Sequence, residues 1–105
     1  VRLISRERLR EVSAVAFEGV DEIFGSPATW ALGYSIGRPG ADRQGAATAF
    51  GWGGVGGSHA YADTASGIAF ALTKNRLTSD FSAAEHVVGI VMEAVLTANS
   101  KKARK

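Results

Sequence analysis

The chain contains 105 residues, of which 13 are glycine, two are proline and none is cysteine, and its formal net charge is +2. This length allows one small domain with a modest core, and the lack of cysteine excludes disulfides and thiolate metal sites. No apolar run approaches the ~20 residues that a membrane-spanning helix needs, so we expect no membrane span. The sequence starts at Val1 without the charged and apolar regions of a signal peptide, and we therefore expect a cytoplasmic protein.

The first half of the chain is expected to contain one helix and one strand. Residues 5–17 predict a helix, because Ser5 can cap it and the apolar residues that follow recur at helical spacing. Residues 18–27 contain two glycines and a proline and predict a loop. The alternating residues 29–37 predict a strand, and residues 38–45 predict a second loop.

The second half is expected to contain three short strands, at residues 48–52, 58–63 and 68–73. Residues 64–67 end in glycine and predict a hairpin turn between the last two strands. One face of the third strand carries only small side chains, those of Ala69, Ala71 and Thr73. We expect a helix to pack closely against that face.

A long helix is expected to follow the strands, because apolar residues at positions 87–98 recur at helical spacing. Ser82 and Glu85 predict a capping box, in which the Ser82 hydroxyl accepts a hydrogen bond from the Glu85 amide. The basic residues 100–105 are expected to form a disordered, solvated tail and not a nucleic-acid surface, because no aromatic side chains lie among them. The chain thus divides into a folded segment at residues 1–99 and this tail.

The order of these elements indicates an α+β fold. Clustered strands with a helix at each end are typical of an antiparallel sheet flanked by an N-terminal and a C-terminal helix. A sheet of three or four strands is thin for independent stability, which suggests that part of the fold is supplied from elsewhere.

Two glycine motifs match known patterns but lack the structural context that those patterns require. Residues 51–56 match G-x-G-x-x-G, but a predicted strand follows them where a dinucleotide site needs a helix. Residues 33–37 match G-x-S-x-G around Ser35, but a Pro-Gly loop follows where a nucleophile elbow needs a helix. His59 and His86 lie 27 residues apart and form no ligand pair, so we expect no metal and no cofactor.

Residues 50–58, Phe-Gly-Trp-Gly-Gly-Val-Gly-Gly-Ser, resemble the third motif of the serine β-lactamase-like hydrolases. This superfamily includes class C β-lactamases, D,D-peptidases and family VIII carboxylesterases. The triplet at residues 52–54 stands where the lactamases have Lys-Thr-Gly and the esterase-like branches have His-Gly-Gly or Trp-Gly-Gly. Residues 58–63, which end in Ala-Asp, and residues 67–77, which end in Asn-Arg-Leu, resemble the two strands that follow the motif.

The resemblance extends upstream and covers most of residues 3–97. Residues 30–34, Trp-Ala-Leu-Gly-Tyr, are similar to a Gly-Leu-Gly-Phe-type strand of the superfamily. In every case the matching part is the C-terminal part of the family fold. The resemblance therefore implies that the chain is the C-terminal segment of a β-lactamase-like domain.

The resemblance also implies roles for four residues of the glycine motif. The backbone amide of Val55 would be one donor of an oxyanion hole, and Gly53 and Gly54 would let the backbone approach the substrate. Trp52 would form an apolar wall where a lactamase has a lysine. Without that cation the site would favour a neutral ester over a lactam or peptide that carries a carboxylate.

The nucleophile and the base of the superfamily are missing from this sequence. None of the nine serines is followed by lysine three residues later, and neither Tyr34 nor Tyr61 begins a Tyr-x-Asn element. We expect both groups on a missing N-terminal portion of the protein, and we expect the chain alone to be inactive. Its expected partners are a small ester substrate and that missing portion, or another copy of the chain paired along an open sheet edge at residues 68–73.

Three functions remain open from the sequence. The first is part of a carboxylesterase-like serine hydrolase that works through an acyl-enzyme. The second is a non-catalytic β-lactamase-like module for binding or assembly. The third is a β-lactamase or D,D-peptidase, against which Trp52 argues.

Overall fold

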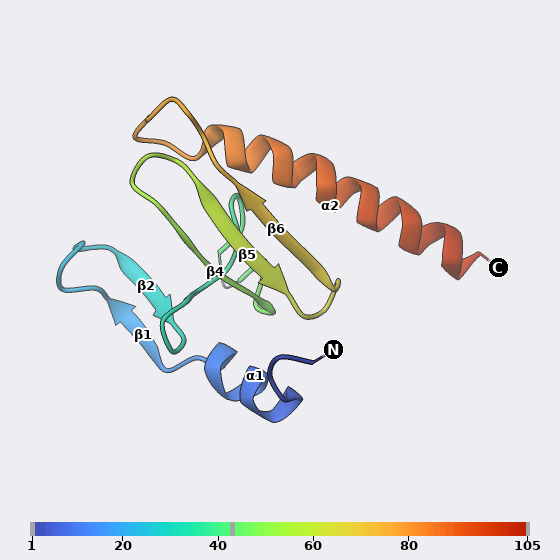
Figure 1. The fold of residues 1–105 in the computed structure, drawn as a ribbon, viewed down its shortest axis with the longest axis horizontal. Coiled ribbons are helices and arrows are strands. Elements are labelled where there is room, and N and C mark those ends of the chain that lie inside the picture. The colour runs from blue at the N-terminus through green and yellow to red at the C-terminus, as the bar shows by residue number, and fades with distance from the viewer. Residues whose placement is uncertain (1, 43, 105) are drawn as a thin grey trace.

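The computed structural model describes residues 2–42 and 44–104, which form one antiparallel sheet and two helices (Figure 1). In chain order the elements are α1 (Arg6–Ser13), β1 (Phe17–Val20), β2 (Pro27–Trp30), β3 (Ser35–Ile36), β4 (Ala49–Gly53), β5 (His59–Asp63), β6 (Ile68–Leu72) and α2 (Ser82–Ala103). The six strands pair with their sequence neighbours, in the order β1-β2-β3-β4-β5-β6. This arrangement confirms the α+β class and adds strands that the sequence did not predict.

The start of the chain is less helical than expected. Ser5 caps α1 as predicted, because its hydroxyl accepts from the Arg8 amide at 3.0 Å. The helix ends at Ser13, because Ala14 is extended, with φ −73° and ψ 148°. Phe17, which was predicted to be helical, begins β1 and pairs with Trp30 of β2. The predicted loop at residues 18–27 is therefore most of a β-hairpin.

The strand predicted at residues 29–37 is two strands joined by a tight turn. Trp30 at the end of β2 pairs with Ser35 at the start of β3. Between them the Ala31 amide donates to the Tyr34 carbonyl at 2.8 Å, and Gly33 has a φ of +85°. Glycine adopts this conformation without steric cost, so the chain reverses here despite its continuous alternation of large and small side chains.

The three strands of the second half lie where they were predicted, and no strand end differs from its prediction by more than one residue. Their hairpin turn at residues 64–67 is also confirmed, and Gly67 has a φ of +72°. The Asp63 carboxylate holds this turn, because it accepts from the Thr48 hydroxyl, the Ala65 amide and the Ser66 amide and hydroxyl. Burial raises the pKa of Asp63, but these hydrogen bonds outweigh burial and hold the pKa below its ordinary value.

The core lies between α2 and one face of the sheet. Its buried members are Ala46, Ala49, Tyr61 and Val88, against which Phe70 and Met92 pack. The helix thus packs against the face that carries the large side chains, where it buries more apolar area. The prediction that it covers the small face is wrong: Ala69 and Ala71 are exposed, and no described element covers them.

The two ends of α2 differ from the sequence predictions. The expected capping box does not form: Ser82 donates its amide and hydroxyl to the Asp80 carboxylate, and the Glu85 amide donates to the Phe81 carbonyl. At the other end the helix continues to Ala103, so residues 100–103 are not a disordered tail, while residue 105 lies outside the described residues. Lysine side chains in the last turn favour this extension, because they oppose the negative end of the helix dipole.

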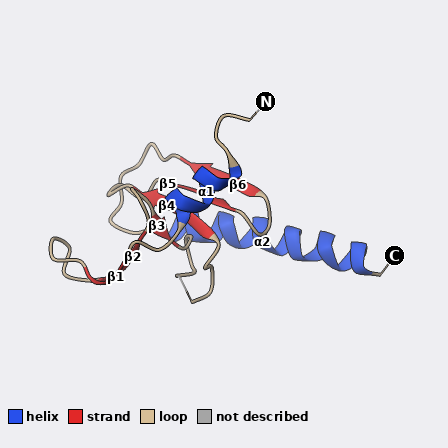
Figure 2. Cartoon of the chain, turned by 90° about the horizontal axis from the view of Figure 1, so that it is seen from below, coloured by secondary structure: helices blue, strands red, loops and turns tan. Residues whose placement is uncertain are grey.

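The β1–β2 hairpin and the C-terminal half of α2 project from opposite ends of the molecule (Figure 2). In α2 only Ala84 and Val88 are buried, and Leu96 is 64% exposed. Among the described residues no helix combines the length and the apolar character needed to cross a membrane.

Candidate functional site

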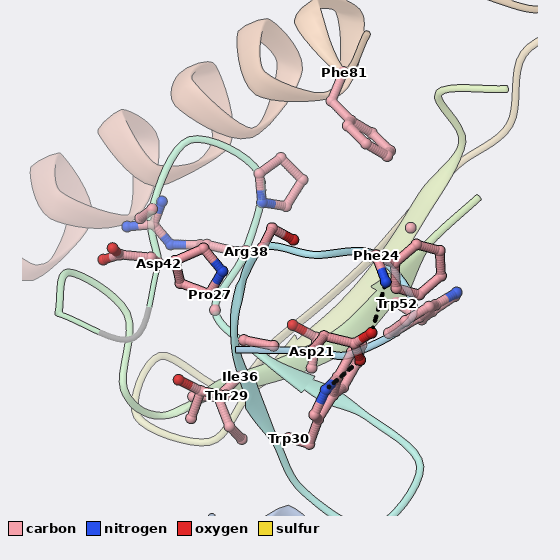
Figure 3. Close-up of a pocket in the computed structure, with 18 of the residues that line it drawn as sticks. Asp21, Phe24, Pro27, Thr29, Trp30, Ile36, Arg38, Asp42, Trp52 and Phe81 are labelled. Atoms are coloured by element: carbon pink, nitrogen blue, oxygen red, sulfur yellow. Dashed lines mark hydrogen bonds between the residues drawn. The ribbon is translucent and has the colours of Figure 1, made fainter. Parts of the chain in front are cut away.

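The glycine motif borders a cavity of about 920 Å³, which we call the main cavity (Figure 3). Its walls come from the β1–β2 hairpin, β3, the loop at residues 37–42, the last three residues of β4, the start of β5 and the start of α2. It opens beside β4 because β3 is only two residues long. Gly51 pairs with Ser35, and the part of β4 beyond Gly51 has no strand partner on that side among the described residues.

Two stacked indoles form one wall of the main cavity. The rings of Trp30 and Trp52 lie 4.6 Å apart between centroids, with 30° between their planes. Trp52 is 47% exposed, and both indoles also border a second hollow of about 400 Å³. The tight turn after Trp30 and the short β3 bring these two strands close enough for the stack to form.

Asp21 fixes the Trp30 indole. One carboxylate oxygen accepts from the amides of Ile23 and Phe24, each at 2.8 Å, and the other accepts from Trp30 Nε1 at 3.2 Å (Figure 3). The hydrogen bond from the Phe24 backbone, with those from Ile23 and Trp30, outweighs slight desolvation and holds the pKa of Asp21 below its ordinary value. Asp21 is therefore a carboxylate at neutral pH.

The sequence-predicted site residues divide into two groups. Trp52 and Gly53 line the main cavity, whereas Gly54 and Val55 lie in the turn that follows β4 and do not line it. Val55 is 94% exposed at the tip of this turn, which the Gly57 amide closes by donating to the Gly54 carbonyl at 3.0 Å. Trp52, the expected substrate wall, and Val55, the expected oxyanion donor, are close in sequence, but only Trp52 lies on the surface of the main cavity.

The two motif glycines also have different surroundings. A Cβ on Gly53 would lie 2.8 Å from the Phe81 ring and 2.9 Å from His59, so packing within the chain already requires glycine there. The expectation that Gly53 leaves space for a substrate is therefore wrong, because protein side chains fill that space. A Cβ on Gly54 would lie no closer than 3.9 Å to its nearest neighbour, the Ser58 carbonyl oxygen.

His59 and Phe81 are the remaining notable side chains of this wall. Their rings meet edge to face, with 5.9 Å between centroids, and the Nδ1 atom of His59 is buried without a hydrogen bond of normal geometry. Burial lowers the pKa of His59, so the imidazole is neutral at neutral pH. Ser35 lines the same cavity, but no hydrogen bond joins it to His59, and a loop follows its motif.

The G-x-G-x-x-G match at residues 51–56 is followed by a strand, as the sequence predicted. Residues 51–56 lead into β5, whereas a dinucleotide site needs a helix at that point. Within residues 2–42 and 44–104, no three His, Cys, Asp or Glu side chains come together as a metal site.

Sequence reasoning missed three residues that shape the site: Asp21, Trp30 as a stacking partner, and Phe81. One signal was present for Asp21, because an aspartate that begins a glycine-containing loop often accepts from the amides that follow it. The contacts of Trp30 depend on the reversal at Gly33, which was not predicted. The helix start at Ser82 was predicted to within a residue, but the packing of Phe81 against β4 was not.

In comparisons with known proteins, no family model matches the chain, and no curated protein and no solved structure is significantly similar to it. The β-lactamase-like resemblance consequently stands on the motif series described above.

Proposed function

We propose that this chain is part of a carboxylesterase-like serine hydrolase and supplies its Trp-Gly-Gly strand and one oxyanion-hole amide. The nucleophilic serine and its base come from another part of the protein, and reaction proceeds through an acyl-enzyme. The observation that carries the proposal is the position of Trp52 on β4, where a stretch of strand with no described partner on the β3 side borders the main cavity.

The order of elements supports the proposal. A motif strand is followed by two further antiparallel strands and a long helix, in the order that the resemblance implies. Strand β6 has no partner on its outer side among the described residues, so it is available to pair with the missing portion. The exposed small face of β6 is equally available for packing.

The charge of the cavity supports an ester substrate over a lactam. The described residues that line it contribute four carboxylates, from Glu18, Asp21, Asp42 and Glu85, and one guanidinium, from Arg38. Asp21, Asp42 and Glu85 alone outnumber the guanidinium, and they would repel the carboxylate that a lactam antibiotic or a peptide terminus presents. Trp52 adds an apolar wall for an acyl or alcohol group and contributes no cation.

The Val55 amide would act on the oxygen of the tetrahedral intermediate. Val55 follows Gly54 at the first central position of its turn, where the amide points away from the turn hydrogen bond. For catalysis the missing portion must bring the acyl group to this turn, with its oxyanion about 3 Å from the amide nitrogen. The reacting carbonyl would then lie at the edge of the main cavity, and its substituents would extend toward Trp52.

Replacing the Val55 amide tests the proposal directly. Proline suits the first central position of such a turn and removes only the N–H, so Val55→Pro should fold normally. In the full-length protein we expect Val55→Pro to lower kcat for nitrophenyl acetate by about 10²- to 10³-fold, and Val55→Ala to leave it unchanged. The melting temperatures of both variants, measured by circular dichroism, should match that of the unaltered protein.

Three results would count against this function. If the full-length protein hydrolyses neither nitrophenyl acetate nor a chromogenic cephalosporin, the enzyme hypothesis is wrong. Higher catalytic efficiency on the cephalosporin would replace the esterase by a lactamase. Equal activity of Val55→Pro and Val55→Ala would exclude the oxyanion role of this amide.

A second candidate is a non-catalytic module for binding or assembly. The rings of Phe81 and His59 favour it, because they occupy the space that a Cβ at position 53 would need and so explain Gly53 by packing alone. Retention of the main cavity without hydrolytic activity in the full-length protein would support this alternative.

A further inference from the structure

The two tryptophans of the chain are concentrated at one place. Both line the main cavity and stack on each other, and Trp52 is still 47% exposed. Phe24, which is 66% exposed, lines the same cavity. Exposed indoles held in a fixed orientation present a negative quadrupole that attracts organic cations.

Asp21 places a negative charge at the edge of this aromatic surface. Its oxygen accepts from Trp30 Nε1 at 3.2 Å, and a donor bond to an anion raises the electron density of the indole ring. Because the Phe24 and Ile23 amides hold the other oxygen, the carboxylate cannot turn away from Trp30 without breaking the hairpin turn. The anion and the aromatic faces are therefore positioned before any ligand arrives.

Other charged side chains among the described residues also line the cavity. Arg38, which supplies a guanidinium, lies at the far end of the cavity from Trp52 (Figure 3). Asp42 and Glu85 add carboxylates, and His59 adds no positive charge because it is neutral. With Asp21, these carboxylates outnumber the described guanidinium, which favours a positively charged ligand.

From these observations we propose that the main cavity binds a quaternary ammonium group against the face of Trp52 that Trp30 leaves uncovered, with Asp21 as its counter-charge. A quaternary ammonium fits better than a primary amine, because it spreads its charge over methyl groups that also contact the rings. The site needs no hydrogen-bond acceptor beyond the carboxylate that it already contains.

This inference extends the proposed function to a substrate class, and that extension rests on the proposed function. The substrate would be an ester whose alcohol or acyl part carries a quaternary ammonium group. With the ammonium against Trp52, the ester carbonyl would extend along β4 toward the Val55 turn. The binding of the cation itself does not depend on catalysis.

Tryptophan fluorescence of the 105-residue chain tests the binding, because both fluorophores lie in the site. The probes are choline and 3,3-dimethylbutan-1-ol, which has the same shape but a carbon in place of the charged nitrogen. We expect a saturable change with choline and a dissociation constant about three- to thirtyfold weaker for the neutral alcohol. The choline affinity should fall as sodium chloride is added at constant pH, whereas the alcohol should not respond.

Two variants and a control locate the site. Asp21→Asn and Trp52→Leu should each weaken choline binding about three- to thirtyfold, while Glu93→Gln, which removes one exposed carboxylate from α2, should not. Equal affinities of the two probes, or no saturable response to choline, would overturn the inference. The comparison of probes on the unaltered chain decides the question even if Asp21→Asn does not fold.

The outcome is separable from that of the proposed function. Choline binding by a full-length protein that hydrolyses no ester would remove only the esterase. Hydrolysis of nitrophenyl acetate, without preference for an acetylated choline over its neutral isostere, would remove only the ammonium site.

Discussion

The two halves of the sheet are held by different interactions. Strands β4 to β6 contribute to a packed core with α2, in which Ala49 is 1% exposed and Tyr61 4%. In α1 no residue is buried, and all four residues of β1 are exposed. The first half depends on backbone pairing, on the caps of Ser5 and Asp21, and on the stack of Trp30 against Trp52. The cavity lies where the two halves meet, so the hairpin whose first strand is wholly exposed supplies one of its walls.

The largest effect should come from the core of the second half. Val88→Ala removes a side chain that is 1% exposed and should lower the free energy of unfolding by about 2–3 kcal/mol. Val20→Ala in β1, where the side chain is 62% exposed, should change it by less than about 0.5 kcal/mol. Urea unfolding followed by circular dichroism measures both. Equal losses would mean that β1 is covered in solution, by another copy or another segment.

The two motif glycines should respond differently to alanine. Gly53→Ala places a Cβ 2.8 Å from the Phe81 ring and should destabilise the fold by about 1–3 kcal/mol. Gly54→Ala meets only ordinary contacts and should change stability by less than about 1 kcal/mol. The same urea titration checks this pair. A stable Gly53→Ala variant would show that Phe81 and the start of α2 can move away from β4.

Acid should weaken the second half through Asp63. Because hydrogen bonds lower the pKa of this carboxyl in the folded state, its contribution is complete above about pH 4 and is lost as the pH falls through the lowered value. Asp63→Asn should lower stability by about 1–2 kcal/mol at pH 7 and flatten its decline below about pH 4. Urea midpoints measured from pH 7 to pH 2 test this, with Glu93→Gln as the control. An unchanged slope would show that other carboxyls govern the acid response.

The smallest expected effect is self-association along β6. This edge strand is apolar throughout and has no outer partner among the described residues, so we expect copies of the chain to pair weakly along it. Ala71→Lys on the exposed face should lower the association constant, because edge lysines repel a second copy. Light scattering across a concentration series detects the change. A monomer at every concentration would exclude this pairing.

Local patterns predicted the second half of the fold well and the first half poorly. Alternation in β5 and β6 and helical spacing in α2 reflect burial on one face, which the sequence records directly. The alternation from Trp30 to Ile36 looked the same, but it conceals a reversal that only the positive φ of Gly33 allows. Helix α2 packs against the large side chains of β6 and not against its small ones. The pattern of a single strand does not show which of its two faces a helix will cover.

The candidate site follows the same division. Trp52 and Gly53 were selected from a local motif, and both lie on the cavity wall. Trp30, Asp21 and Phe81 come from three other elements, and their proximity depends on the hairpin, the short β3 and the start of α2. A single sequence carries no sign of contacts between residues of different elements. The motif therefore predicted the β4 wall of the cavity, and the walls from the other elements were seen only in the structure.

The overhanging half of α2 has a practical consequence. Because the chain contains no cysteine, a single one introduced at Ala98 would be its only thiol. That position lies on an exposed part of the helix, about ten residues beyond the last buried side chain, or roughly 15 Å along the axis. Coupling through this thiol would tether every molecule to a sensor surface in one orientation, with the indole pair left accessible to the solution.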